Sequence, residues 1–136
     1  MHLKSKSEFN IASAELLIES TYYAPSVHCS YYGAYQFSKT VLNKLGLTYD
    51  NLNSLAQSNS TVTGSHNILI NEISKKYEEK TNKLDARELK NSFKLLKAYR
   101  HMSDYDNIAV DSTKSNEALR ISKEIIKKIK QKLWPP

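Results

Sequence analysis

The chain has 136 residues, a formal net charge of +6, and only 3 glycines, 3 prolines and 1 cysteine. This length is typical of one domain, and so few helix breakers in a chain rich in Ala, Leu, Ile, Lys and Glu favour an all-α fold. The lone Cys29 excludes an internal disulfide and a cysteine-based zinc site. No stretch reaches the roughly 18 apolar residues of a membrane span, and residues 1–7 lack the apolar core of a secretory signal. We therefore expect a single domain over residues 1–136, in the cytoplasm and without membrane contact.

Five segments carry apolar residues at helical spacing. The expected helices run from Ser7 or Asn10 to the break at Thr21, from Pro25 to Gly46, from Ser65 to Glu79, from Leu84 or Asp85 to beyond Arg100, and from the end of the polar segment 106–115 to Leu133. Pro25 suits a first helical turn, and Gly46 suits a helix end. Five helices with short connections predict an antiparallel bundle.

Residues 47–64 form the longest expected loop. The segment is rich in Asn, Ser and Thr, and only Leu52, Leu55 and Ala56 offer a short helical turn. Loops of this length are uncommon inside compact domains and are often mobile or functional. We therefore expect either a lid or a tolerated insertion here.

The positive charge is concentrated in residues 114–132, where seven basic residues accompany Glu117 and Glu124. Such a face attracts phosphate-rich partners, but it also keeps a small domain in solution. Because lysines without interleaved aromatic side chains recognise nucleic acid weakly, we interpret the segment as a solvated face rather than a nucleic-acid patch.

Arg100 continues an apolar helix stripe, because Leu89, Phe93 and Leu96 precede it at steps of four, three and four. A guanidinium in this position needs an anionic partner or a solvent-filled edge. The alternative is structural, since an arginine near a helix end also binds terminal carbonyls and favours the negative end of the helix dipole.

Asp104 lies near the expected end of the same helix, where the dipole disfavours an acid. A basic residue four positions before an acidic one is also the weaker order for a helical ion pair. Something outside the helix must therefore favour Asp104 there. With Tyr105, the trio offers a cation for phosphate, a carboxylate for orientation or proton transfer, and a phenol.

These features resemble the HEPN domains, small helical bundles common in bacterial and archaeal toxin and defence systems. The resemblance spans most of the chain and rests on the helix at Ala14–Leu17, on Ser30–Gln36 leading to Val41 and Leu42, on His66 at a helix start, and on the run Arg100–Tyr105. That last run is similar to the Arg-x-x-Ala-Asp-Tyr signature of one HEPN branch, with Ser103 in the small-residue position.

The resemblance implies a metal-independent endoribonuclease without a cofactor, in which an arginine and a histidine act together across a homodimer interface. It places the arginine at Arg100. The histidine position, after four to six intervening residues, falls on Tyr105, Asp106 and Asn107, so the family's usual histidine is absent. RNA or a nucleotide is the implied ligand, and a nucleotidyltransferase-type antitoxin is an implied partner.

Two further histidines are candidate contacts to RNA. Adjacent helical residues point about 100° apart, so His101 reaches the same phosphate as Arg100 only if the helix ends there, and otherwise it is a surface residue. His66 follows Gly64 at a helix start, where it approaches an anion or is simply exposed. The four histidines lack the local spacing of a metal site, and we expect none.

Three tyrosines cluster in the second expected helix. Tyr31 and Tyr35 lie on its apolar stripe, which favours core packing over base stacking. Tyr32 points about 100° away from Tyr31 and is the better candidate for a pocket or dimer contact. It is also the tyrosine that we expect to contact RNA.

Three functions remain open from these residues. In the first, Arg100 polarises a scissile phosphate while Asp104 and Tyr105 position the groups that help a ribose 2′-hydroxyl attack. In the second, the same groove binds a nucleotide or RNA without cleavage, or docks a partner. In the third, Arg100 and Asp104 form a structural pair that fixes how two helices or two chains meet.

Overall fold

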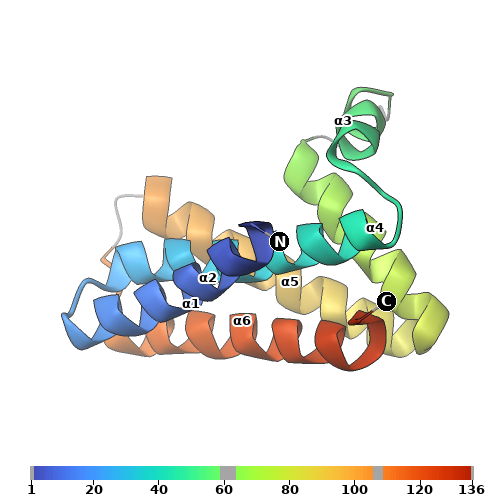
Figure 1. The fold of residues 1–136 in the computed structure, drawn as a ribbon. Helices are drawn as coiled ribbons and strands as arrows, with labels where there is room; N and C mark the ends of the chain where they lie inside the picture. Colours follow the sequence, from blue (N-terminus) through green and yellow to red (C-terminus); the bar gives the residue numbers. More distant parts are fainter. Residues whose placement is uncertain (1, 59–63, 106–108, 136) are drawn as a thin grey trace.

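The computed structural model describes residues 2–58, 64–105 and 109–135. These ranges contain no strand, and they form the helices α1 (His2–Glu19), α2 (Tyr23–Lys44), α3 (Tyr49–Ser58), α4 (Ser65–Lys80), α5 (Lys83–Tyr105) and α6 (Ser112–Leu133) (Figure 1). The all-α prediction is confirmed, but the expected number of five helices is one too low. None of these helices is both long enough and apolar enough to cross a membrane.

The additional helix, α3, lies in the segment that we expected to be a loop. Its start is capped reciprocally: the backbone N–H of Thr48 donates to Asn51 Oδ1 at 3.1 Å, and the backbone N–H of Asn51 donates to Thr48 Oγ1 at 3.4 Å. Leu52 then enters the core and Leu55 packs against it. The asparagine and serine content suggested a loop, but the same residue types cap helices. Residues 59–63 of the expected loop lie outside the described ranges.

Individual residues near the helix ends explain where α2 ends and where α6 begins. At the end of α2, Gly46 has φ of 97°, and the backbone N–H of Leu47 donates to the Leu42 carbonyl at 2.9 Å, as expected for a glycine-terminated helix. Asp111 Oδ1 accepts the backbone N–H of Lys114 at 2.9 Å and caps the start of α6. The first helix begins at His2 rather than at Ser7 or Asn10.

α2 is the central helix, because it contacts α1, α4, α5 and α6 and has more buried residues than α4, α5 or α6. Figure 1 shows α1, α2, α5 and α6 lying alongside one another, with α3 beside α4 at one end. Fully buried side chains fill the space between these helices, among them Tyr31, Phe93, Ile73 and Ile129. α2 therefore presents one face to α4 and α5, and another to α1 and α6.

Buried serines join the helices on the α1 and α6 side of α2. Ser7 Oγ donates to the Gly33 carbonyl at 2.6 Å, Ser26 Oγ to the Ala14 carbonyl at 3.0 Å, and Ser122 Oγ to the Ser30 carbonyl at 2.5 Å. Each small side chain satisfies its own hydroxyl on a backbone carbonyl of the neighbouring helix, which allows the helix axes to approach closely.

The bond from Ser122 supports a stability prediction. We expect Ser122→Ala to lower the free energy of unfolding by roughly 0.5–1.5 kcal/mol relative to Ser54→Ala, because only Ser122 loses a buried hydrogen bond. Ser54 is an exposed serine inside α3, so both changes gain the same intrinsic helix propensity. Urea unfolding measures the two values, and equal values would contradict the packing role of Ser122.

Candidate functional site

The guanidinium of Arg100 lies among three tyrosine rings near the end of α5. Its Cζ is 5.2 Å from the ring centre of Tyr31, 5.6 Å from that of Tyr32 and 5.8 Å from that of Tyr105. The side chain is only 12% exposed. The electron-rich ring faces stabilise the cation in this partly buried place, which explains how an arginine can continue an apolar stripe.

The polar contacts of Arg100 use only part of its hydrogen-bonding capacity. A guanidinium has five N–H donors. Arg100 Nη1 lies 3.5 Å from Asp104 Oδ2, and Arg100 Nε is buried and makes no hydrogen bond within the described residues. The tyrosines hold the charge in place without satisfying its donors, and this arrangement suits an arginine that binds a further anion.

His28 contacts the same carboxylate oxygen from another helix. Its Nδ1 lies 2.8 Å from Asp104 Oδ2, although the two residues are 76 positions apart in the chain. A carboxylate only accepts hydrogen bonds, so Nδ1 carries the proton that is shared with Asp104, and in the neutral ring Nε2 is left as an acceptor. The His28 side chain is 46% exposed and the Asp104 side chain 20% exposed, so this imidazole faces solvent.

Asp104 therefore joins Arg100 and His28 into one cluster. The external partner that Asp104 required is His28, a residue that we did not predict to belong to the site. The signal that would have found it is the spacing of His28, Tyr32 and Tyr35, which puts all three on one face of α2. The ring centres of His28 and Tyr32 are 4.7 Å apart.

A shallow pocket of about 390 Å³ opens beside this cluster. Its lining residues come from the start of α2 and the end of α5: Ala24, Pro25, His28, Cys29, Ser103 and Asp104. Cys29 is partly buried. Burial, and to a lesser extent the charge of Asp104, raises the pKa of its thiol, so the reactive thiolate is disfavoured.

His66 lies on the other side of the tyrosines. Its Nδ1 is 2.6 Å from the Tyr31 hydroxyl, and its ring stacks on that of Tyr35 at 4.5 Å between centres. Burial, together with the charges of Arg100 and Lys97, lowers the pKa of His66 from 6.5 to about 4. His66 is therefore neutral near pH 7, where it holds Tyr31 rather than supplying a positive charge.

The lowered pKa of His66 predicts how stability depends on pH. Between about pH 6.5 and pH 4 the unfolded chain binds a proton at His66 that the folded chain does not, so acidification through this window destabilises the fold. We expect the free energy of unfolding to fall less steeply there in His66→Asn than in the wild type. His101→Asn, at an exposed histidine, is the control, and a wild-type slope in His66→Asn would contradict the assignment.

The other two residues predicted for the site, His101 and Tyr105, lie at different positions relative to Arg100. The helix continues past Arg100 to Tyr105, so His101 points away from the guanidinium and is exposed, with its ring centre 5.0 Å from that of Tyr105. Tyr105 is itself exposed and covers one side of Arg100. The structure thus gathers Arg100, Asp104, Tyr105, Tyr32 and His66 around one centre, and leaves His101 at its edge.

Fold and cluster together define an all-helical domain with a partly buried arginine, held by tyrosines and joined through one carboxylate to a histidine of another helix. The HEPN domain family model matches residues 1–132. The chain therefore belongs to the HEPN domain family, as the sequence resemblance indicated. No curated protein and no solved structure matches the chain. Membership of this family supports an RNA-related or nuclease-like function in general and names no substrate.

Proposed function

We propose that this domain binds single-stranded RNA at the Arg100 cluster and cleaves it without a metal ion. The observation that carries the proposal is that Arg100 and His28 both contact Asp104 Oδ2. A cation for a phosphate and a proton acceptor thus lie on either side of one carboxylate. The described residues contain no group of three or more potential metal ligands, and the proposed reaction uses protein groups alone.

Each group has a defined role in the proposed reaction. Arg100 binds a non-bridging oxygen of the scissile phosphate and stabilises the charge that develops on it. His28 Nε2 takes the proton of the adjacent ribose 2′-hydroxyl, while Asp104 accepts the Nδ1 hydrogen and fixes the ring. The 2′-oxygen attacks phosphorus and the bond to the 5′-oxygen breaks. The leaving oxygen receives a proton from protonated His28, and the products end in a 2′,3′-cyclic phosphate and a 5′-hydroxyl.

In this proposal His28 takes the role of the family histidine that is absent after Arg100. The resemblance places an arginine and a histidine on opposite sides of a dimer interface, whereas this cluster is complete within one chain. The faces of Tyr32 and Tyr105 beside the cation suit stacking of the flanking bases, because every base has a π-face and such stacking tolerates sequence variation. Single-stranded RNA fits this site better than a duplex, in which the bases are already stacked.

The proposal is tested by incubating the purified chain with single-stranded RNA and with transfer RNA in EDTA. We expect cleavage of single-stranded RNA in EDTA at the same rate as in magnesium, and no cleavage of DNA of the same sequence. Cleavage that requires added metal would contradict the mechanism, and absence of cleavage with retained binding would leave the second candidate function.

That second candidate is RNA or nucleotide binding without cleavage. The low exposure of Arg100 favours it, because a guanidinium held between tyrosines reaches only the ligand atoms that approach its open edge. On the strength of the family resemblance we also propose that the chain is cytoplasmic, forms a homodimer and has a nucleotidyltransferase-type antitoxin partner. The toxin or defence role belongs to the first candidate function, RNA cleavage. Growth of cells that express the chain, with and without its neighbouring genes, tests the toxin role.

A further inference from the structure

Basic side chains follow one face of α5 and end beside the Arg100 cluster. They succeed one another at steps of four, three, four and three residues, and we call them the basic stripe: Lys83, Arg87, Lys90, Lys94 and Lys97. Residues at these steps are neighbours on the surface of a helix. At a rise of 1.5 Å per residue, the basic stripe is about 21 Å long.

Two pockets follow one another along the basic stripe, between α4 and α5. The first, of about 460 Å³, contains the first three members of the stripe. The second, of about 530 Å³, contains the last two members and reaches His101, the residue after Arg100. Because α4 and α5 are antiparallel neighbours joined by a short turn, the two pockets form one groove that leads from this turn toward the Arg100 cluster.

The opposite wall of the groove, which comes from α4, carries no net charge. Its two charged residues, Lys75 and Glu78, balance one another, and Asn71 and Asn67 are neutral. Glu78 is the only acid among the described residues that line the two pockets. An anionic strand in this groove therefore meets cations on one wall and amide groups on the other.

The charge of the basic stripe is not balanced by acids of the protein. Within residues 2–58, 64–105 and 109–135, no member of the stripe forms an ion pair. Asp85 and Glu88 belong to the same helix, but by 100° per residue they lie on its other side. Like charges at steps of three and four destabilise a helix, so the stripe costs stability unless an anion binds it.

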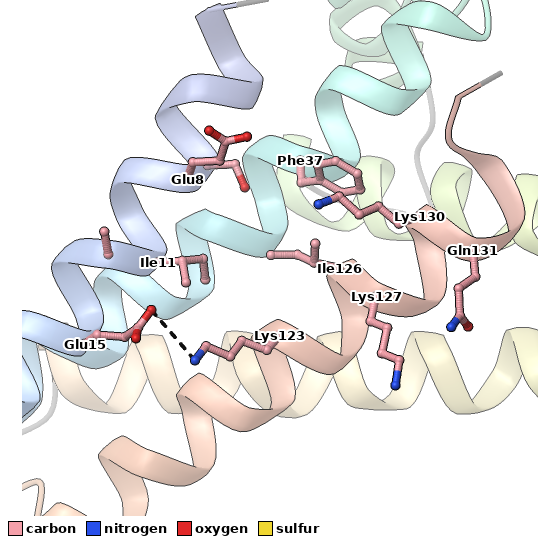
Figure 2. Close-up of a pocket in the computed structure, with 11 residues that line it drawn as sticks. Glu8, Ile11, Glu15, Phe37, Lys123, Ile126, Lys127, Lys130 and Gln131 are labelled. Atoms are coloured by element: carbon pink, nitrogen blue, oxygen red, sulfur yellow. Dashed lines mark ion pairs between the residues drawn. The ribbon is translucent and has the colours of Figure 1, made fainter.

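The lysines of α6 show the contrasting arrangement of a solvated helix. Lys128 Nζ lies 3.3 Å from Glu124 Oε1, one turn earlier in the same helix. Figure 2 shows Lys123 reaching toward Glu15 of α1, with 3.7 Å between Lys123 Nζ and Glu15 Oε1. A basic helix of this protein is thus paired with acids where it only faces water, and the basic stripe lacks such pairs.

Lys97 connects the basic stripe to the Arg100 cluster. Its Nζ donates to Asn67 Oδ1 at 2.9 Å, which holds the lysine near the start of α4. Burial, and next the charge of Arg100, lowers the pKa of Lys97. The charges of Arg100 and Lys97 also both lower the pKa of His66, so the two cations act on the same small region. A phosphate beside them would relieve their mutual repulsion.

We infer that the basic stripe binds successive phosphates of one RNA strand, which extends from the Arg100 cluster along the groove between α4 and α5. This inference rests on the proposed function, because the cluster fixes one end of the strand. Lysines contact phosphate as point charges, so the stripe adds affinity without reading the base sequence. The preferred substrate is then an extended strand of several nucleotides rather than a single nucleotide.

Fluorescence anisotropy with labelled single-stranded RNA of about four and about twelve nucleotides tests the inference. The stripe variant carries Lys90→Gln and Lys94→Gln, which keep the helix propensity. The control variant carries Lys127→Gln and Lys132→Gln, at two exposed lysines of α6, and has the same net charge. In about 0.1 M salt we expect the stripe variant to bind the longer strand about tenfold to thirtyfold more weakly than the control variant.

The salt dependence and the shorter strand complete the test. The slope of the logarithm of affinity against the logarithm of salt concentration is expected to be smaller by about 1.4 in the stripe variant, because two phosphate contacts are lost. The wild type is expected to bind the longer strand more tightly than the shorter one. If the wild type binds RNA but the stripe and control variants behave alike, or if strand length has no effect, the inference is wrong and the proposed function stands. If the wild type binds neither strand, both are wrong.

Discussion

Replacement of Arg100 by alanine is expected to weaken binding of single-stranded RNA roughly tenfold to a hundredfold, because the charged hydrogen bonds to one phosphate are lost. Cleavage is expected to fall further, by about a hundredfold to a thousandfold, since the guanidinium also stabilises charge that develops only in the transition state. Fluorescence anisotropy with labelled RNA measures the first effect, and the rate of product formation under single-turnover conditions measures the second.

Two variants show whether the Arg100 effect is specific. Arg120→Ala removes an exposed arginine of α6 that pairs with Glu117 and Glu124, and it is expected to leave both quantities close to wild type. Arg100→Lys keeps the charge but loses the planar fork, so we expect an intermediate loss. If Arg100→Ala folded normally and bound and cleaved RNA as well as Arg120→Ala, the cluster would not be the phosphate site.

Replacement of His28 is expected to separate cleavage from binding. Loss of the proton acceptor lowers the cleavage rate by about a hundredfold to ten-thousandfold, the usual contribution of a general base, while Arg100 continues to bind the phosphate. His28→Asn is the more informative variant, because its amide can still donate to Asp104 Oδ2 but provides no acceptor in place of Nε2. We expect His28→Asn and His28→Ala to be equally impaired in cleavage and near wild type in RNA affinity.

His101→Ala is the control for His28, since His101 is an exposed histidine directly after Arg100 that points away from the guanidinium. Its cleavage rate is expected to stay close to wild type. Retained cleavage by His28→Asn would show that His28 only positions Asp104. A large loss of cleavage in His101→Ala would indicate that His101, at the edge of the cluster, is the proton acceptor.

Most of the fold followed from helical periodicity and composition. The start of α4 at Ser65, the end of α2 before Gly46 and the burial of Tyr31 and Tyr35 are confirmed, because each has a strong local signal. The helix α3 was missed because its capping residues, Thr48 and Asn51, are the same residue types that favour turns. Local composition alone does not distinguish these two uses.

The part of the candidate site on α5 was predictable from the sequence, whereas its partners on other helices were not. The run from Arg100 to Tyr105 is contiguous in sequence, and its spacing indicated both an unusual arginine and an acid in need of a partner. The partner, His28, lies 76 residues away, and only the packing of α2 against α5 brings the two side chains to 2.8 Å. The same packing brings His66 from α4 to the Tyr31 hydroxyl. Such distant pairs depend on helix register, which single-sequence patterns do not determine.

The most direct test of the proposed function is the structure of the products formed from a single-stranded RNA in EDTA, compared with the same RNA carrying one 2′-deoxyribose at the cleavage site. We predict 2′,3′-cyclic phosphate and 5′-hydroxyl ends from the all-ribose strand and no cut at the deoxyribose, because the 2′-oxygen is the nucleophile activated by His28. Cleavage at the deoxyribose, or products that carry a 5′-phosphate, would contradict this mechanism.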